Sequence, residues 1–306
     1  MGPPLSTDNK PQDVYLIDAS IYIFRYYFSL PDNWWSKSEY PTAAVYGYVH
    51  WLIRFLKSTK ATHVAACFDE SLESCFRNEI YADYKCSRVL PDEDLAFQLE
   101  ACKQITELLG IPAYASTTHE ADDLIGTLAK RCRKNKLKVN ILSRDKDLSQ
   151  LVVGDLDVIW DFPDGEPLGK EGIFKKLGVF PHQVADYLAL VGDSSDDIPG
   201  VPGVGKKTAA ALFALSGSWS NLQQDFSAVA ALPLRGAVSL AGKLKEFEEQ
   251  ISMALQLSKI VDNAPLNRRF SVKRKKLDLA ACVAYGRELG FGRNFETSMN
   301  KLVEVL

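Results

Sequence analysis

Two kinds of segment alternate through the first two-thirds of the 306-residue chain, and this alternation restricts the possible folds more than any other feature. Short apolar runs rich in β-branched residues predict buried strands at Val14–Ile17, His63–Phe68, Val139–Leu142 and Leu156–Ile159. Longer stretches with helical spacing of apolar residues predict helices at Ala43–Lys57, Leu95–Leu109, Ala121–Lys134 and Pro181–Val191. The alternation predicts an α/β fold with a mostly parallel sheet flanked by helices.

The last third of the chain has a different pattern. From about Asp186 only helices are predicted, and glycines and prolines interrupt them. A basic stretch, Asn267–Lys276, precedes a last predicted helix from Leu277 to Leu289. Because no low-complexity linker separates the regions, we predict two parts that share an interface, residues 1–185 and residues 186–306.

The composition is that of an ordinary globular protein, with 46% hydrophobic and 25% charged residues. No apolar run approaches the ~18–20 residues that span a bilayer. The first residues, MGPPLSTDNKPQD, lack the basic and apolar regions of a secretory signal. The six cysteines form no C-x-x-C pair, which favours free thiols in a reducing cytoplasm. We therefore predict a cytoplasmic protein without a membrane partner.

Four acidic residues fall where predicted strands end, an unfavourable place for a charge without a partner. Asp18 ends the strand in LIDAS, and Asp69 ends the strand in HVAACFDE. Asp145 and Asp147 follow the strand in ILSRDKDLSQL, two residues apart, so they can face one side. Ligands of parallel sheets bind at the carboxyl ends of the strands. The four carboxylates therefore mark this edge as the candidate site.

Five more acids extend the group. Glu120, Asp122 and Asp123 open the predicted helix in STTHEADDLIG, and Asp193 and Asp196 lie in the helical region. Each acid alone is more typical of a helix cap or of a first turn that complements the helix dipole. Together they would repel one another without cations, and oxygen ligands alone suit Mg²⁺ or Mn²⁺. Two such ions can activate a water and stabilise the leaving oxygen of a phosphodiester.

A glycine-rich segment of the helical region, Gly200-Val201-Pro202-Gly203-Val204-Gly205, leads directly into a predicted helix that opens with Lys206, Lys207 and Thr208. Glycines let the backbone approach a phosphate, and the amides of a helix N-terminus point towards it. The segment therefore indicates a sequence-independent phosphate clamp of the helix–hairpin–helix kind. The alternative is a plain interhelical turn, although the full G-x-x-G-x-G-K-K-T-A string is more specific than a bare G-x-G.

Eight motifs carry a family resemblance, in the order LIDAS, AVYGYV, FDE, FRNEIYADYK, HEADD, SRDKDL, GDSSDD and GVPGVGKKTA. They resemble the bacterial 5′–3′ exonuclease/flap endonuclease family, and more closely the amino-terminal nuclease domain of DNA polymerase I. The resemblance runs from about Val14 to the closing segment LGFGRNFETSMNKL. It implies a PIN-like α/β core joined to a helix–three-turn–helix module that grips duplex DNA. Because no polymerase sequence follows, we expect a free-standing nuclease.

The resemblance also implies roles for single residues. The nine acids match the family's metal-site acids, expected to hold two Mg²⁺ or Mn²⁺ ions, and the helix–three-turn–helix module is expected to use a K⁺ ion. Arg25 matches a basic residue near the scissile phosphate. Arg77, Lys85 and Arg88 match basic residues of a helical gateway for the 5′ strand. Tyr84 matches an aromatic residue on which a terminal base stacks.

Two observations qualify these roles. A solvated helix face is the alternative for residues 77–88, because Glu79 and Asp83 interleave with the basic residues. The chain also departs from the family pattern, with Ala19 where glycine is usual and Asp197 where asparagine is usual. Asp197 adds a charge beside Asp196, and we expect this charge to change the affinity for one metal.

We predict a structure-dependent 5′-nuclease for DNA with 5′ ends, flaps or single-strand/duplex junctions, acting as a monomer and associated with the bacterial nucleoid. The net charge of −3 does not exclude a nucleic-acid partner, since nine of the 39 acids would belong to one site and 36 basic residues remain. One alternative is a PIN-type ribonuclease, which would be expected to lack the clamp at Gly200–Lys207. The other is a non-catalytic junction-binding protein, which would be expected to have lost acids.

Overall fold

The computed structural model describes residues 11–71 and 74–306. Strands and helices alternate in its first half, as β1 (Asp13–Asp18), α1 (Ala19–Ser29), α2 (Ala43–Thr59), β2 (Val64–Asp69), α3 (Phe76–Ile80), α4 (Glu93–Leu108), β3 (Ala113–Ser116), α5 (Ala121–Lys134), β4 (Lys138–Leu142) and β5 (Val158–Trp160). The helices that follow are α6 (Lys170–Leu177), α7 (Val184–Val191), α8 (Lys206–Ser216), α9 (Trp219–Gln224), α10 (Phe226–Ala230), α11 (Ala237–Glu246), α12 (Glu248–Ser258), α13 (Leu279–Glu288) and α14 (Arg293–Val303). Two 3₁₀ turns are η1 (Asp147–Leu151) and η2 (Pro181–Gln183).

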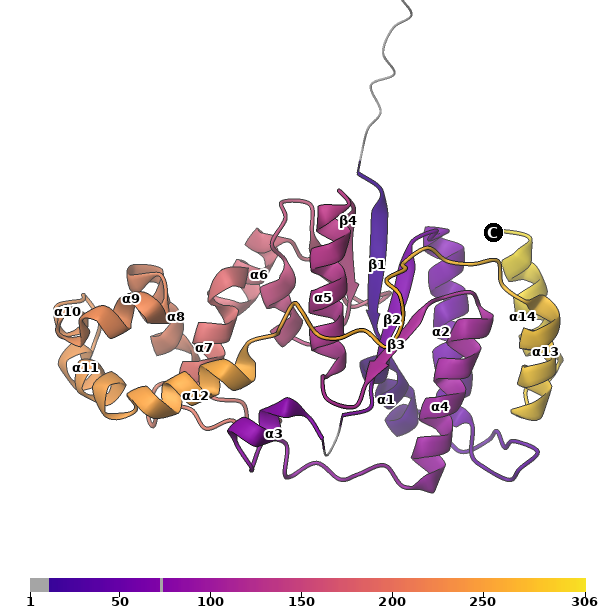
Figure 1. The fold of residues 1–306 in the computed structure, drawn as a ribbon, viewed down its shortest axis with the longest axis horizontal. Coiled ribbons are helices and arrows are strands. Elements are labelled where there is room, and N and C mark those ends of the chain that lie inside the picture. The colour runs from indigo at the N-terminus through magenta and orange to yellow at the C-terminus, as the bar shows by residue number, and fades with distance from the viewer. Residues whose placement is uncertain (1–10, 72–73) are drawn as a thin grey trace, which may run out of the picture.

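The five strands form one parallel sheet in the order β3-β2-β1-β4-β5 (Figure 1). β1 lies at its centre, where Tyr15 pairs with Val64 of β2 on one side and with Asn140 of β4 on the other. All the strand pairings are parallel, which confirms the predicted sheet. The carboxyl ends of the strands therefore lie together at one edge, next to α1 and α3.

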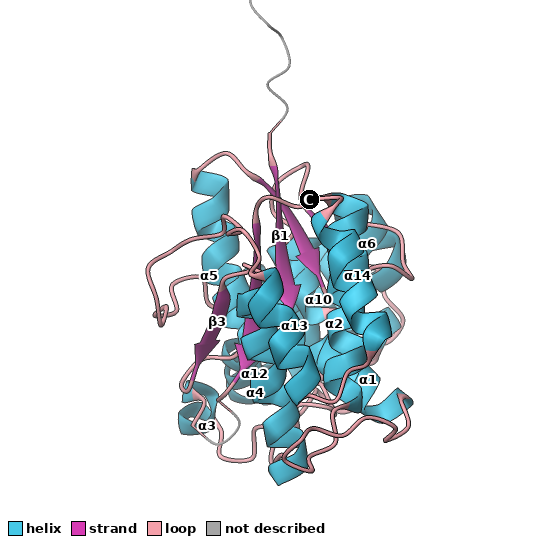
Figure 2. Cartoon of the chain, turned by 90° about the vertical axis from the view of Figure 1, so that its right-hand side faces the viewer, coloured by secondary structure: helices cyan, strands magenta, loops and turns pink. Residues whose placement is uncertain are grey.

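Helices cover both faces of the sheet (Figure 2). Alternate residues of the strands are therefore buried on opposite sides of the sheet. Val14 and Leu16 of β1 pack with α5 in one apolar cluster. Ile17 packs with α1, α2 and α4 in another. A strand buried on both faces is apolar along its length, which explains why the sequence signal for β1 was continuous rather than alternating.

A third apolar cluster belongs to the helical part, which extends to the left of the sheet in Figure 1. Trp219 and Phe213 are almost fully buried in it, together with residues of α7, α11 and α12. Within the described residues, no helix is long and apolar enough to cross a membrane.

The two last helices return to the sheet. Cys282 of α13 and Phe295, Met299 and Leu302 of α14 are buried in the cluster that contains α2 and α4. The chain thus runs from the sheet into the helical part, and α13 and α14 then pack against the helices of the sheet again. The predicted division at residue 185 stays a prediction. The packing of α13 and α14 shows that the segment beyond α12 contacts the first part.

The predicted elements differ from the observed ones at a few places. α5 has the predicted bounds, whereas the helix predicted at Pro181–Val191 is divided into η2 and α7. β3 was missed, because its four residues, Ala-Tyr-Ala-Ser, lack the β-branched side chains that mark a strand. The six cysteines are free thiols, as predicted, and Cys86 is exposed while the other five are buried.

Candidate active site

The carboxyl edge of the sheet gathers acidic side chains from several elements. Asp18 ends β1 and caps α1, and its Oδ2 accepts a hydrogen bond from Ser143 Oγ at 2.8 Å. Asp69 ends β2, and its Oδ1 accepts from the backbone N–H of Ala121 at 2.7 Å. Asp122 lies in the first turn of α5. The parallel sheet thus brings together acids that are far apart in the sequence.

Burial and mutual repulsion raise the pKa values of these carboxyls. Burial, followed by the charges of Asp69 and Asp145, raises the pKa of Asp18 to about 7. Burial and the charge of Asp145 raise the pKa of Asp147 to about 7 as well. The pKa of Asp122 lies well above its ordinary value, because of burial and then the charge of Asp145. Such a group of carboxyls is stabilised by a cation that removes the repulsion.

The donor chemistry of this edge fits a hard divalent cation, because Mg²⁺ and Mn²⁺ prefer oxygen ligands. Asp147 Oδ1 is buried, and its charged neighbour is the Lys146 ammonium, with Nζ at 3.0 Å. The side chains do not, however, meet at one point. Within residues 11–71 and 74–306, no three His, Cys, Asp or Glu side chains form a group positioned to hold an ion. The edge offers suitable donors, and the acids would have to shift to share one ion.

The two acids of the helical part are ion-paired with basic residues of the first part. Asp193 Oδ2 lies 2.5 Å from Lys146 Nζ, and Asp196 Oδ1 lies 2.6 Å from Arg88 Nη2. Burial opposes ionisation of Asp193, but the hydrogen bonds from Lys146 and Ser195 hold its pKa below the ordinary value. These ion pairs place Asp193 and Asp196 at the interface between the two parts.

Arg77 and Asp123 form a buried ion pair, and their roles at a phosphate and at a metal stay predictions. The Arg77 side chain is only 2% exposed, and its Nη1 and Nη2 donate to the two carboxylate oxygens of Asp123 at 2.7 and 2.8 Å. Its Nε donates to the carbonyl oxygen of Leu257 at 2.8 Å. The guanidinium therefore faces protein groups and is not available to a phosphate. Asp123 is fully buried, and both of its carboxylate oxygens accept from Arg77.

Tyr84 is also buried, and its stacking on a terminal base stays a prediction. Its side chain is 3% exposed, and its hydroxyl donates to Glu120 Oε2 at 2.9 Å. Lys85 Nζ contacts the other carboxylate oxygen of Glu120 and lies 3.7 Å from Asp196 Oδ2. Burial raises the pKa of Glu120, but the charges of Lys85 and Arg77 outweigh it and lower that pKa. Lys85 therefore lies at the acidic edge, charged and partly exposed.

Arg25 and Arg88 form ion pairs with different acids, Arg25 with two acids that follow β5 and Arg88 with Asp196. Arg25 projects from α1 and is ion-paired with Asp161 and with Asp164, the latter at 3.1 Å. Its guanidinium also lies 5.1 Å from the ring centroid of Tyr22. Arg88 is 43% exposed and can reach solvent. Of the four basic residues that the resemblance singled out, Arg88 is the most exposed, Lys85 and Arg25 are similarly exposed at 16% and 17%, and Arg77 is buried.

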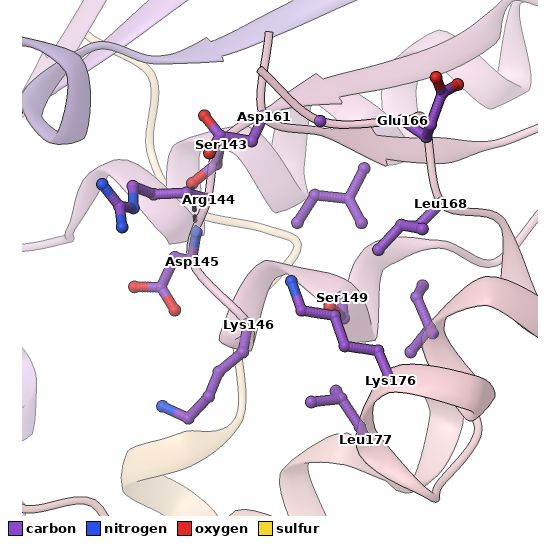
Figure 3. A pocket seen from close by; sticks show the side chains of 13 residues that line it. Ser143, Arg144, Asp145, Lys146, Ser149, Asp161, Glu166, Leu168, Lys176 and Leu177 are labelled. Atoms are coloured by element: carbon purple, nitrogen blue, oxygen red, sulfur yellow. Dashed lines mark hydrogen bonds between the residues drawn. The ribbon is translucent and has the colours of Figure 1, made fainter. Parts of the chain in front are cut away.

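A cavity of about 290 Å³ opens beside Asp145, between η1, the end of β5 and α6 (Figure 3). Lys146 and Lys176 line it, and the sequence analysis did not single out either lysine. Ser143, which holds Asp18, lines it as well. The position of Lys146 inside the SRDKDL motif was the available signal, whereas nothing in the sequence around Lys176 indicates that α6 contacts the edge.

The predicted clamp forms the turn between α7 and α8. The backbone N–H of Val201 donates to the carbonyl oxygen of Leu190 at 2.8 Å, and Gly203 has a φ of +76°, which a glycine tolerates. α8 begins at Lys206, with Gly205 as its N-cap. Lys206 and Lys207 are exposed at this helix start. The amides of the first turn therefore point to solvent, where a phosphate can approach.

Comparison with known families agrees with this geometry. Residues 13–178 match the family described as "5′-3′ exonuclease, N-terminal resolvase-like domain". Residues 179–279 match the family described as "5′-3′ exonuclease, C-terminal SAM fold". The two matches together cover the sheet and the helices up to α12, and they leave α14 and all but the first residue of α13 outside.

Curated relatives carry the same description. A 5′-3′ exonuclease of Buchnera aphidicola is 34% identical over 259 residues, which are 84% of this chain and 89% of the relative. A 5′-3′ exonuclease of Aquifex aeolicus is 39% identical over 220 residues, 70% of this chain and 75% of the relative. DNA polymerase I of Pseudomonas aeruginosa is 37% identical over 253 residues, which are 82% of this chain but 27% of the polymerase.

Solved structures share the fold. T5 5′-exonuclease with bound divalent metal ions superposes with a TM-score of 0.66 at 20% identity, covering 96% of this chain and 99% of the other. The catalytic core of Rad2 in complex with DNA substrate superposes with a TM-score of 0.61 at 16% identity, covering 97% and 96%. The resemblance inferred from the motifs is confirmed by the family matches, and the chain belongs to the 5′-3′ exonuclease family.

Proposed function

We propose that this nuclease hydrolyses DNA phosphodiesters near 5′ ends, at flaps and at single-strand/duplex junctions, leaving 5′-phosphate and 3′-hydroxyl products. The observation that carries the proposal is the convergence of acids from β1, β2, α5 and the segment after β4 on one edge of the sheet. A buried group of repelling carboxyls is costly for stability alone, and it is typical of a site that works with cations.

The acids that would hold the metal are those that still face the edge, namely Asp18, Asp69, Asp122, Asp145 and Asp147, with Asp193 and Asp196 from the helical part. Bound Mg²⁺ or Mn²⁺ would supply a nucleophilic water and neutralise charge on the phosphate. The T5 5′-exonuclease structure with divalent metal ions supports this assignment. Glu120 would contribute indirectly, since its carboxylate already holds Lys85 and Tyr84.

The basic residues would position the substrate. Lys85 carries an ammonium at the acidic edge, where it can approach a phosphate on which negative charge develops. Arg88 lies nearer to solvent and would steer the single strand. The hairpin at Gly200–Gly205, followed by Lys206 and Lys207, would hold the phosphates of the adjacent duplex. The Rad2 core in complex with DNA substrate supports DNA as the partner.

The proposal also includes a K⁺ ion, the monomeric state and the location in the cell. A K⁺ ion at the helix–three-turn–helix would use backbone carbonyls of the hairpin, since carbonyl oxygens suit hard cations. Two of these carbonyls already accept hydrogen bonds, that of Gly200 from Gln250 and that of Pro202 from Lys243. These two side chains would compete with the ion for the carbonyl oxygens. We further infer that the chain acts as a monomer, in the cytoplasm and on the bacterial nucleoid.

End-labelled single-stranded, duplex, 5′-flap and RNA substrates, incubated with Mg²⁺ or with a chelator, test the function. We expect Mg²⁺-dependent cleavage of flap and duplex DNA, and none by an Asp145→Asn/Asp147→Asn double variant that still binds the flap. A preference for RNA would favour a PIN-type ribonuclease instead. Binding without cleavage under every condition would favour a junction-binding protein. A Lys206→Ala/Lys207→Ala variant should bind duplex less tightly, with the salt slope lowered by about two.

A further inference from the structure

A lysine lies between two acids of the candidate metal site. Lys146 Nζ is 2.5 Å from Asp193 Oδ2 and 3.0 Å from Asp147 Oδ1. Asp147 begins η1 in the first part, whereas Asp193 follows α7 in the helical part. The ammonium therefore joins one carboxylate from each part, at the seam between them.

The ion pair with Lys146 occupies the outer oxygen of Asp193. Asp193 Oδ1 accepts from the backbone N–H of Ser195 at 2.8 Å and from Ser195 Oγ at 2.6 Å. Oδ2 accepts from Lys146. A divalent ion that used Asp193 Oδ2 and Asp147 Oδ1 would meet the ammonium within a few ångströms, and two cations at this spacing repel strongly in a partly buried site.

We propose that the Lys146 ammonium is an exchangeable occupant of the position between Asp147 and Asp193, and that it sets the divalent-ion concentration at which an ion binds there. The ammonium neutralises the two carboxylates and holds the two parts together until an ion replaces it. The exchange is feasible because the lysine side chain is flexible and already 38% exposed. This inference rests on the proposed function, since it concerns the acids of the same site.

Arg144 offers a matched comparison. It lies two residues before Lys146 in the same segment, its side chain is exposed, and it makes no ion pair with a described residue. Figure 3 shows its guanidinium on the other side of Asp145 from the Lys146 ammonium. Removing either residue deletes one positive charge from this edge, but only Lys146 lies between Asp147 and Asp193.

The test measures Mn²⁺ binding to the full chain without DNA, by electron paramagnetic resonance of the free ion at constant ionic strength. We expect Lys146→Met to lower the Kd of the weaker ion about tenfold, which corresponds to ~1.4 kcal/mol. Lys146→Arg keeps the charge and should leave this Kd close to that of the wild type. Arg144→Met should lower it less than about threefold. Asp193→Asn combined with Lys146→Met should abolish the gain.

An unchanged or higher Kd in Lys146→Met overturns the proposal. An equal decrease in Arg144→Met also overturns it, because the effect would then come from long-range charge. Lys146→Gln repeats the test if circular dichroism shows that Lys146→Met has not folded. Cleavage of a 5′-flap substrate by the wild type in Mg²⁺, measured in parallel, tests the proposed function separately. Ion exchange without cleavage would reject that function alone, whereas the absence of Mn²⁺ binding in wild type and variant would reject both.

Discussion

The guanidinium of Arg77 is enclosed by acceptors from two distant segments of the chain. It donates to Asp123 and Glu120 at the start of α5, and to the carbonyl oxygens of Leu257 and Lys259 at the end of α12. It thereby ties α3 and α5 to the helical part. Its removal would leave the buried Asp123 carboxylate without its partner, and an uncompensated buried charge is strongly destabilising.

We therefore expect Arg77→Met to lower the free energy of unfolding by about 3–5 kcal/mol, measured by urea denaturation. Arg88→Met provides the matched control, because Arg88 is a nearby but exposed arginine, and we expect a change within about 0.5 kcal/mol. A full loss of cleavage rate in Arg77→Met at unchanged stability would instead restore the catalytic role that the resemblance implied.

Lys85 is the residue for which we expect an effect on turnover. Its ammonium lies beside Glu120 and Asp196 at the acidic edge, so it can approach a phosphate there. Removing one preorganised donor of this kind typically costs about 10²–10³ in rate. Single-turnover cleavage of a 5′-flap substrate should show this loss in Lys85→Ala, with partial rescue in Lys85→Arg and little change in flap binding. A rate within about threefold of the wild type would place Lys85 among ordinary surface lysines.

For single residues, the sequence predicted the positions of the acidic side chains better than those of the basic side chains. Asp18 and Asp69 could be placed because a strand end fixes where its last side chain lies. The burial of Arg77 and Tyr84 could not be foreseen, since it depends on contacts with Glu120 and with the end of α12, far along the chain. A local pattern of alternating charges does not show which helix will later cover it.

Among the elements, the close approach of α7 and the hairpin at Gly200–Gly205 depends on the glycine at position 200. A Cβ on Gly200 would lie 2.2 Å from the carbonyl oxygen of Val191, the last residue of α7. Gly205, at the other end of the hairpin, has no atom within 4 Å of its would-be Cβ and has extended backbone angles. The same substitution at these two glycines should therefore have opposite outcomes.

We expect Gly200→Ser to lower the free energy of unfolding by about 1–3 kcal/mol, as overpacking against backbone does. Gly205→Ser should be neutral or slightly stabilising, because serine is a preferred N-cap residue and Gly205 caps α8. Denaturant unfolding of both variants checks this. Equal stabilities of the two variants would show that the hairpin relaxes freely around residue 200.

The elements themselves were predicted where periodicity was strong. α5 and the central strands follow from runs of apolar residues with clear spacing. β3 and the short α3 were not, because four or five residues carry too little pattern, and tertiary contacts decide their conformation. The parallel pairing of β3 with β2 nevertheless extends the acidic edge to the start of α5.

For the molecule as a whole, the acidic edge links stability to pH and to divalent ions. In the folded state the pKa values of Asp18 and Asp147 are raised from 3.8 to about 7. A carboxyl with a raised folded-state pKa contributes stability that is fully present below the unfolded value and lost as pH rises through the folded value. In a chelator, the protein should therefore lose stability as the pH rises from about 4 to about 7.

Thermal melts across this pH range check the expectation. Each kcal/mol lost should lower the Tm by roughly 2 °C for a chain of this size. Mg²⁺ should remove most of the decrease, because a bound cation favours the ionised carboxylates. Asp18→Asn should flatten the pH dependence in the chelator. A Tm that rises from pH 4 to pH 7 without divalent ions would contradict the assignment of these raised pKa values.

The return of α13 and α14 to the sheet has a consequence for the synthesis of the protein. At about 5–20 residues per second, α14 leaves the ribosome roughly 10–50 s after α2, the helix that it covers. The helical part, whose apolar cluster lies mostly between Val179 and Leu257, can fold in that interval. The apolar surface of α2 and α4 stays uncovered until Phe295, Met299 and Leu302 arrive. We therefore expect the nascent nuclease core to depend on chaperones until α14 has been made, and to close only when this helix leaves the ribosome.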